Sequence, residues 1–251
     1  MALQKYKRDS ELTYALGATL VEELLKTHPD AITRAFLRPT KKQGGELKKI
    51  IERLKARGIE IIESTKAFNV LGAKDNCLLA AEFKKECLYE PQSDELRMPG
   101  QKNIILVNPS DSGNLGTIMR SVAAFGFKEI SIITPAVDPY DPKVIRASMG
   151  AIFHLLVNVQ DKPVIYPDEC NNFFAFILDK NAKSLDDIDP ISCKHKDLTL
   201  IFGNEAAGLP KDFCSKYGVT PVFIKQSANV DSLNLGVAAS IAMHHFKDDL
   251  F

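Results

Sequence analysis

The stretch that decides the fold lies near the middle of the chain and reads Asn108-Pro-Ser-Asp-Ser-Gly-Asn-Leu-Gly-Thr-Ile-Met-Arg-Ser-Val-Ala-Ala-Phe-Gly126. The preceding residues 103–107 are mostly apolar and predict a short buried strand, and the Pro/Ser/Asp/Gly run predicts a loop. Asn114 belongs to a residue type that often begins helices, so we expect a helix with Asn114 as its N-cap. A strand, a loop and a helix in this order indicate an α/β protein.

The expected helix carries one arginine without a helical partner. Four residues at helical spacing would form its buried stripe, namely Leu115, Ile118, Met119 and Val122. Arg120 falls on another face, where the residues three and four positions away are small and neutral, so no helical salt bridge can form. Most arginines are simply exposed to solvent, but the five fixed donors of a guanidinium also suit a phosphate. These residues alone leave both interpretations open.

Length and composition predict an ordinary globular protein. The chain has 251 residues, 45% of them hydrophobic, which suits one large domain or two small ones. No apolar run approaches the roughly 18 residues that a membrane span needs, and the N-terminus lacks an apolar signal region. We therefore expect a soluble protein of the cytoplasm, or of an organelle matrix after processing. Five widely spaced cysteines without a CxxC pair, and histidines without a ligand pattern, predict neither a disulfide framework nor a metal site.

The net charge is zero, yet basic residues gather in the first part of the chain. Residues 34–57 contain nine Lys or Arg and two acidic residues, a local charge of +7. Such a segment attracts polyanions, most often a nucleic acid, although a lysine-rich helix face is about as often merely solvated. The candidate residues for contacts with a nucleic acid are Arg34, Arg38, Lys41, Lys42, Lys48 and Lys49.

The hydrophobic pattern divides the chain into two parts. In the first part we expect helices at 11–26 and 47–57 and strands at 32–37, 59–62 and 77–81. In the second part, strands alternate with helical stretches as in a parallel, doubly wound sheet; they are expected at 103–107, 130–133, 173–178, 198–202 and 220–224. A polar stretch with two prolines and a glycine separates the parts, which predicts domains at 1–92 and 102–251 joined by a linker at 93–101. The expected last helix, 233–246, is apolar or small nearly all round, which predicts burial on several sides, in part against a second copy of the chain.

The expected strand at 198–202 runs into a glycine-rich turn, Gly203-Asn-Glu-Ala-Ala-Gly-Leu-Pro210. Open α/β sheets bind ligands at the carboxyl ends of their strands, and Gly203 would let a flat ring approach the main chain. Glu205 is the only ionisable group of the turn, although it could equally be an acid that stabilises the first turn of a helix. No lysine follows Gly208, so the turn is not a phosphate loop.

Polar side chains also precede the expected last helix, in Ile224-Lys-Gln-Ser-Ala-Asn-Val-Asp-Ser-Leu-Asn-Leu-Gly236. Ser232 could serve only as the N-cap of that helix. Asn234 has less structural reason to stand within the first apolar turn, which makes it a candidate functional residue.

Together the segments 114–126, 200–209 and 230–238 resemble the three motifs of the SpoU (TrmH) family of RNA ribose methyltransferases. The segment Arg146-Ala-Ser-Met-Gly-Ala-Ile-Phe-His154 is similar to the family's sequence between the first two motifs. The resemblance covers about residues 101–251. It implies a SPOUT-type α/β domain whose C-terminal segment threads a deep trefoil knot, preceded by a small α/β substrate-binding domain like a ribosomal protein, and it implies a homodimer.

The resemblance also implies S-adenosylmethionine as the cofactor and assigns residues to it. Backbone groups of Phe202, Gly203, Ile224 and Leu233 would hold the adenine. The family's catalytic and substrate-positioning residues match Asn114, Arg120, Glu205, Ser232 and Asn234. Two residues depart from the third motif, because Lys225 stands where a proline is usual and Ala228 where a glycine is usual.

The implied reaction is the attack of a ribose 2′-hydroxyl on the sulfonium methyl group, in which positioning supplies much of the acceleration. The hydroxyl proton must leave in or before the transition state. A guanidinium is almost never neutral, so we expect Arg120 chiefly to grip the phosphate beside the target ribose and to stabilise the developing alkoxide, while Glu205 holds Arg120. A role of Arg120 as the base, once it is desolvated, stays open as the alternative. Asn114 and Ser232 or Asn234 would orient the ribose. The alternatives are a catalytically inactive, knotted RNA-binding protein, a dehydrogenase, which the lack of a GxGxxG after the first strand disfavours, and methylation of a tRNA base. The sequence does not distinguish rRNA from tRNA as the target, because RNA recognition depends on shape.

Overall fold

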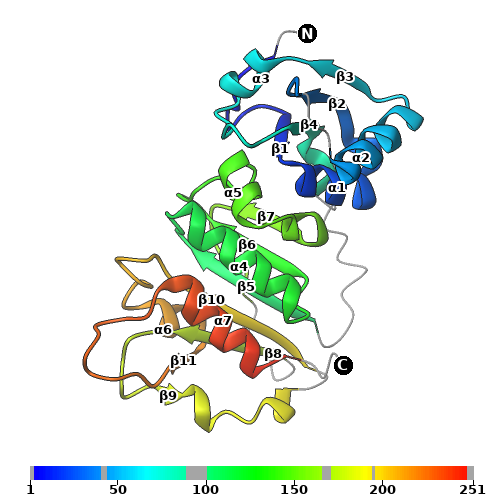
Figure 1. Ribbon diagram of the computed structural model, residues 1–251. Helices are drawn as coiled ribbons and strands as arrows, with labels where there is room; N and C mark the ends of the chain where they lie inside the picture. The colour runs from blue at the N-terminus through cyan, green and yellow to red at the C-terminus, as the bar shows by residue number, and fades with distance from the viewer. Residues whose placement is uncertain (1–2, 41–43, 89–100, 166–170, 194–195, 248–251) are drawn as a thin grey trace. The chain divides into compact units, whose positions relative to one another are not determined.

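The computed structural model describes residues 3–40, 44–88, 101–165, 171–193 and 196–247 (Figure 1). The chain divides into two compact units, one of residues 1–90 with 138–154 and the other of residues 91–137 with 155–251. The predicted linker at 93–101 lies outside the described residues except for Gln101.

The first unit contains a four-stranded sheet in the order β1-β4-β2-β3. Strand β4 is antiparallel to both of its neighbours, whereas β2 and β3 are parallel. The strands are β1 (Leu12–Leu16), β2 (Ile32–Leu37), β3 (Glu60–Glu63) and β4 (Leu79–Lys84). The helices are α1 (Ala18–Thr27), α2 (Gly45–Ala56), α3 (Thr65–Val70) and α5 (Pro142–Ala147), with short 3-10 turns at η1 (Pro29–Ala31), η2 (Lys85–Leu88) and η4 (Ala151–His154).

The helix expected at 11–26 is wrong in its first third. Residues 12–16 form β1 and pair with β4, and Gly17 adopts a φ of 125° before α1 begins. The long-range pairing with β4 determines the secondary structure of this segment, because Tyr14, Ala15 and Leu16 are buried in the sheet. The other elements expected in the first part are confirmed as α2, β2, β3 and β4, with ends that differ by a few residues.

A segment from between β6 and β7 of the second unit completes the core of the first unit. The hydroxyl of Thr13 donates a 2.6 Å hydrogen bond to the carbonyl oxygen of Tyr140, and both residues are buried. The ring of Phe153 packs edge-on against Phe83 with centroids 5.7 Å apart. Nε2 of His154 lies 2.8 Å from Oε1 of Glu23. No periodicity in the sequence indicates this packing.

The second unit contains a seven-stranded sheet in the order β7-β6-β5-β10-β8-β11-β9, and every strand pair in it is parallel. The strands are β5 (Lys102–Val107), β6 (Glu129–Ile133), β7 (Leu156–Gln160), β8 (Asn171–Phe176), β9 (Lys183–Ser184), β10 (Asp197–Phe202) and β11 (Thr220–Phe223). The helices are α4 (Ser112–Ala124), α6 (Phe213–Tyr217) and α7 (Leu235–His245), with 3-10 turns at η5 (Leu185–Asp187) and η6 (Pro190–Cys193). The predicted parallel α/β sheet is therefore confirmed, although β7 and β9 were not expected.

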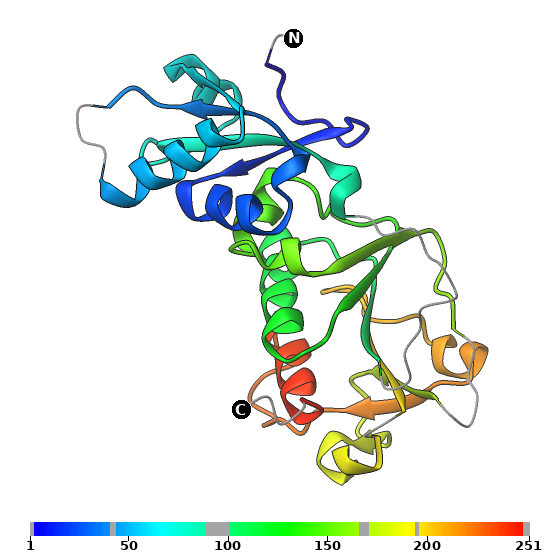
Figure 2. The same cartoon turned by 90° about the vertical axis from the view of Figure 1, so that its right-hand side faces the viewer.

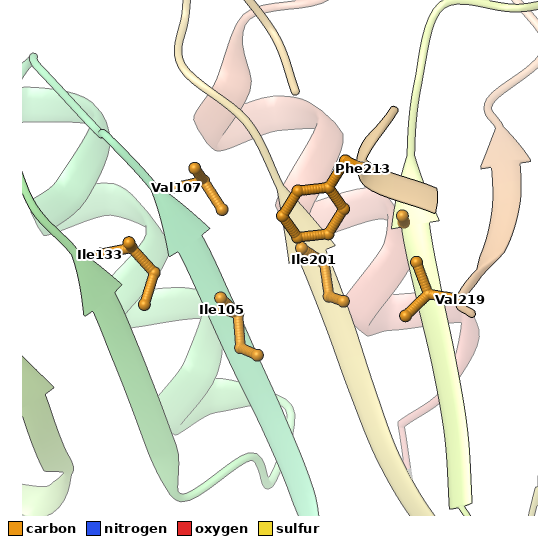
Figure 3. Close-up of a cluster of buried hydrophobic side chains, with 7 residues drawn as sticks. Ile105, Val107, Ile133, Ile201, Phe213 and Val219 are labelled. Atoms are coloured by element: carbon orange, nitrogen blue, oxygen red, sulfur yellow. The ribbon is translucent and has the colours of Figure 1, made fainter. Parts of the chain in front are cut away.

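Helices cover both faces of this sheet, with α4 and α7 on one side and α6 on the other (Figure 2). Phe213 of α6 packs on a cluster of buried side chains that Figure 3 shows, namely Ile105, Val107, Ile133, Ala175, Ile201 and Val219. On α4 the predicted stripe is confirmed, because Leu115, Ile118, Met119 and Val122 are fully buried.

Helices α4 and α7 run parallel and in close contact. A Cβ on Gly236 would lie 3.3 Å from Cγ2 of Thr117, and the hydroxyl oxygens of Ser121 and Ser240 are 2.7 Å apart. In both pairs the residue number on α7 exceeds that on α4 by 119. Moving along α4 therefore means moving along α7 in the same direction, so the two helices are parallel. Small residues on both helices allow this approach, whereas Val237 and Ile241 of α7 stay 47% and 39% exposed in the single chain. Among the described residues, no helix combines the length and the apolar character that crossing a membrane requires.

Candidate functional site

The carboxyl ends of β5 and β10 lie side by side, because Leu106 pairs with Phe202 in register. The order of the chain in the sheet reverses here, since β6 and β7 continue on one side while β8 and β11 continue on the other. Such a reversal opens a crevice outside the strand ends, where open α/β sheets bind ligands. The first two motif segments follow these two strands, and the third leads into α7, which begins beside α4.

The turn after β10 closes on its own backbone. Asn204 and Gly208 exchange two backbone hydrogen bonds of 3.1 and 2.9 Å, and Oδ1 of Asn204 accepts from the backbone N–H groups of Ala206 and Ala207. A Cβ on Gly203 would lie 2.2 Å from the carbonyl carbon of Gly208. The turn itself therefore requires a glycine at 203, whatever ligand approaches it.

Glu205 joins the second motif to the first. Its Oε2 accepts from the backbone N–H of Ser110 at 3.0 Å and from the Ser110 hydroxyl at 2.7 Å. Its Oε1 accepts from the backbone N–H of Asp111 at 3.1 Å and from Nδ2 of Asn114 at 3.2 Å. Partial burial alone would raise the pKa of the Glu205 carboxyl, but these hydrogen bonds outweigh burial and hold the pKa below its ordinary value. The carboxylate is thus ionised and poorly suited to accept a proton.

Two asparagines extend this network to the third motif. Nδ2 of Asn234 donates to Oδ1 of Asn114 at 2.9 Å, and Oδ1 of Asn234 accepts from the backbone N–H groups of Gly236 and Val237. Asn234 is thus the N-cap of α7, so Ser232 does not have that role.

The prediction that Asn114 caps its own helix is wrong. Asp111 is the N-cap of α4, because its backbone is extended and its Oδ1 accepts from the Asn114 backbone N–H at 2.7 Å.

A cavity of about 170 Å³ lies beside the network. All four predicted cofactor residues, Phe202, Gly203, Ile224 and Leu233, line it, together with Glu205 and Ser232. The rings of Phe176 and Phe202 stack 4.6 Å apart at this wall. A second cavity of about 480 Å³ adjoins it and shares the loop that starts at Ile224. Apolar walls with backbone groups along one side can hold a flat, aromatic ligand.

Lys225 and Ala228, the two departures from the third motif, line the larger cavity. Nζ of Lys225 lies 3.4 Å from Asp186 and 3.9 Å from Asp187, both of η5. All three side chains are more than half exposed, so these ion pairs contribute at most about 1 kcal/mol. Lys225 therefore ties the loop only weakly to η5.

Arg120 stands apart from the network. It follows Asn114 by six residues, which is roughly 9 Å along the axis of α4. Its side chain is exposed and makes neither an ion pair nor a hydrogen bond with any residue that the structure describes. The predicted contact between Arg120 and Glu205 is wrong for the single chain, because the Glu205 oxygens are already occupied by donors of the 110–114 loop.

The candidate RNA-binding residues differ in their surroundings. Arg34 forms a two-point pair with the buried Glu82, with Nε–Oε1 and Nη2–Oε2 distances of 2.9 Å. Arg38 donates to the carbonyl oxygen of Cys77 and lies 4.7 Å over the ring of Phe68. Both arginines thus support the first unit. Lys48 and Lys49 are exposed on α2, whereas Lys41 and Lys42 lie outside the described residues.

Sequence reasoning missed Ser110 and Asn204. Nδ2 of Asn204 donates to the carbonyl oxygen of Asn108 at 2.8 Å, so it reinforces the contact that Ser110 makes with Glu205. Both residues lie within three positions of the end of a strand, where polar residues are common, and Asn204 also lies within the second motif segment, 200–209. Among the described residues, no group of three or more His, Cys, Asp or Glu side chains could hold a metal ion.

Two protein families match parts of the chain. Residues 101–244 match the SpoU rRNA Methylase family, and residues 14–69 match a family described as RNA 2′-O ribose methyltransferase substrate binding.

Three known proteins illustrate the similarity. The chain is 26% identical over 215 residues to the 23S rRNA (guanosine(2553)-2′-O)-methyltransferase RlmP of Bacillus subtilis, which covers 78% of this chain and 84% of that protein. It is 29% identical over 149 residues to Ribosomal RNA small subunit methyltransferase G 2 of Syntrophobacter fumaroxidans, covering 56% of this chain but only 26% of that protein. The fold matches a crystal structure of an AdoMet-bound rRNA methyltransferase from Sinorhizobium meliloti, with a TM-score of 0.76, 24% identity and coverage of 96% of this chain and 88% of that one.

Replacing Gly203 by alanine tests the turn. Because the new Cβ would overlap the Gly208 backbone, Gly203→Ala should lower the free energy of unfolding by about 1–3 kcal/mol, as overpacking does. Chemical denaturation followed by circular dichroism measures this. Gly45→Ala is the control, since nothing lies within 4 Å of its Cβ position, and it should be neutral or slightly stabilising. Equal stability of the two variants would refute the described turn.

Replacing Glu205 by glutamine tests its charge. The folded-state pKa is lowered, so the carboxylate stabilises the fold above its unfolded pKa of about 4.3, and this stabilisation is lost as the pH falls through the folded value. At pH 7, Glu205→Gln should lower the free energy of unfolding by roughly 1–2 kcal/mol, and the difference from the unsubstituted protein should shrink below about pH 4. Denaturation at several pH values measures it, with the exposed Glu52→Gln as control. A difference that does not depend on pH would argue against an ionised, hydrogen-bonded Glu205.

Proposed function

The chain belongs to the SpoU rRNA methylase family, and we propose that it transfers a methyl group from S-adenosylmethionine to a ribose 2′-hydroxyl of structured RNA, in the cytoplasm. The observation that carries the proposal is the convergence of Asn114, Glu205 and Asn234, from three separate motifs, beside one cavity. Ribosomal RNA is the first candidate substrate, because the Bacillus subtilis relative is named for 23S rRNA; tRNA is the second.

The residues around the cavity fit S-adenosylmethionine. Leu233 and Ile224 offer apolar surface and backbone groups to an adenine, and the compact turn at Gly203 leaves the end of β10 without a projecting side chain. When bound, the cofactor would supply an electrophilic methyl group on a positively charged sulfur. We also propose that the segment from β11 to α7 threads the knot that the family resemblance implies.

The network assigns different tasks to its members. Asn114 and Asn234 use their amide groups on each other and on Glu205, so their orientations are fixed before any substrate arrives. Ser232 lines the cavity, and its hydroxyl makes no hydrogen bond to any described residue, which leaves the hydroxyl available to the ribose. Glu205 acts as a positioning residue, because its oxygens already accept hydrogen bonds.

The two parts of the chain suit two tasks. We propose that residues 1–92 bind the RNA substrate, with the exposed Lys48 and Lys49 among the contacts, and that residues 102–251 carry the transfer. The match of residues 14–69 to the substrate-binding family supports this division.

We further propose that the protein is a homodimer through α4 and α7. Val237 and Ile241 expose apolar surface on α7, and α4 exposes Thr117, Arg120 and Ala123. Arg120 does not reach Glu205 of its own chain. In a dimer formed through this face, Arg120 would serve the site of the second copy, where it would hold the RNA phosphate next to the target ribose and stabilise the developing alkoxide.

Methyl transfer is tested with the purified protein, S-adenosylmethionine and either rRNA or tRNA from cells that lack this gene. Digestion to nucleosides and mass spectrometry should find a 2′-O-methylated nucleoside in one of the two RNAs. A methyl group on a base would contradict the ribose assignment. Binding of S-adenosylmethionine by calorimetry without any transfer to either RNA would favour the inactive RNA-binding protein.

Substitution of Arg120 separates binding from transfer. Arg120→Ala should lower the transfer rate by about 100-fold or more and leave the affinity for S-adenosylmethionine unchanged, because Arg120 does not line the cavity. Arg120→Lys should also be slow, since an ammonium lacks the planar pair of donors. The exposed Lys128→Ala is the control. A near-normal rate for Arg120→Lys would remove the requirement for a guanidinium.

The dimer is tested by a charge in the apolar face. The unsubstituted protein should have the mass of a dimer in light scattering, and Ile241→Glu should shift it to the monomer, because a buried carboxylate without a partner is costly. Ile191→Glu is the matched control, since Ile191 is an exposed apolar residue of the same unit but outside this face. A monomeric unsubstituted protein, or a dimeric Ile241→Glu, would contradict the proposed interface.

A further inference from the structure

A separate cavity of about 210 Å³ lies within the first unit. Three distant segments line it: Leu16 and Gly17 at the end of β1; Ala73, Lys74, Asn76 and Cys77 before β4; and Arg146 of α5. Arg146 comes from the segment 138–154, which packs into the core of this unit. The proposed transfer uses none of these residues, so the cavity has no role so far.

The cavity wall carries positive charge without a counter-ion. The Arg146 side chain is half-buried, and its guanidinium makes neither an ion pair nor a hydrogen bond with any described residue. Lys74 is exposed on the same wall, and its ammonium group likewise makes neither an ion pair nor a hydrogen bond with any described residue. The neighbouring Asp75 is fully exposed and lies 3.9 Å from Arg38, which already donates to backbone carbonyls. Two cations therefore face a cavity that offers them no carboxylate.

The remaining groups of the wall leave this charge intact. Burial raises the pKa of the Cys77 thiol, so the thiol is neutral at neutral pH and does not offset Arg146. Asn76 adds an amide group. A stabilising effect of Arg146 on the end of α5 is the alternative, but α5 has only six residues, and such an effect does not call for a cavity or for Lys74.

We propose that this cavity binds a phosphate group of the substrate RNA, with Arg146 and Lys74 as its donors; the proposal rests on the proposed function. A guanidinium presents paired N–H donors that match phosphate oxygens, and an ammonium adds a point charge. Contacts of this kind position RNA without distinguishing its sequence. The cavity lies in the first unit and shares no lining residue with the cavity formed by Phe202, Gly203, Ile224 and Leu233.

The test measures binding of purified ribosomal RNA to the full-length protein on filters between 50 and 200 mM KCl. Arg146→Ala and Lys74→Ala should each weaken binding roughly five- to tenfold near 150 mM, and each should reduce the slope of log affinity against log salt by about one, as loss of one phosphate contact does. Lys143→Ala should bind like the unsubstituted protein, because Lys143 is exposed on the same helix but does not line the cavity. Arg146→Ala that binds like Lys143→Ala would overturn the proposal.

Two further measurements keep the outcome clear. Arg146→Lys keeps the charge and should retain most of the affinity for RNA. If Arg146→Ala does not fold, Arg146→Lys and Lys74→Ala test the proposed phosphate contact instead. Inorganic phosphate should raise the melting temperature of the unsubstituted protein more than that of Arg146→Ala, beyond the general effect of the salt on both. A response to free phosphate without any change in RNA binding would overturn RNA as the occupant. Failure of the unsubstituted protein to bind S-adenosylmethionine would instead refute the proposed function.

Discussion

The ionised carboxylate of Glu205 is the interaction on which the rest of the site depends. It accepts hydrogen bonds from the backbone and hydroxyl of Ser110, from the backbone of Asp111 and from the amide of Asn114. These donors belong to the loop after β5 and to the first turn of α4, whereas Glu205 belongs to the turn after β10. One charged group thus joins the loops that extend from two adjacent parallel strands. Hydrogen bonds to a charged acceptor are stronger than those between neutral groups, which suits a contact that must hold two loops in register.

The geometry around Glu205 follows from backbone constraints as much as from side chains. Gly203 lets the turn fold back on Gly208, and Asn204 stabilises that turn through its own Oδ1. On the other side, Gly236 and Ser240 let α7 approach α4 closely, so the N-terminal end of α7 meets Asn114. Asn234 caps α7 and bonds to Asn114 with the same side chain. The small residues of the third motif therefore serve helix packing, and through it the orientation of the site.

Much of this was accessible from the sequence, and the exceptions have physical causes. The strands of the parallel sheet and the buried stripe of α4 were predictable, because apolar runs and helical spacing depend on local pattern. The cavity residues Phe202, Gly203, Ile224 and Leu233 came from a family resemblance, and they do line one cavity. Strand β1 was mistaken for helix, because its pairing with β4 is a long-range effect. The partner of Glu205 was also mistaken, since a loop that folds back to offer backbone N–H groups leaves no trace in residue type. The packing of 138–154 into the first unit and the pairing of Arg34 with Glu82 depend likewise on contacts between distant segments.

We propose that Asn114 and Glu205 act as one unit in shaping the cofactor site. A double-mutant cycle measures it most directly, with the free energy of S-adenosylmethionine binding determined by calorimetry for the unsubstituted protein, Asn114→Ala, Glu205→Gln and the double variant. The two side chains are in direct contact, so we expect an interaction free energy of about 1 kcal/mol or more, the range for contacting residues. Single effects that add to within about 0.3 kcal/mol would contradict it.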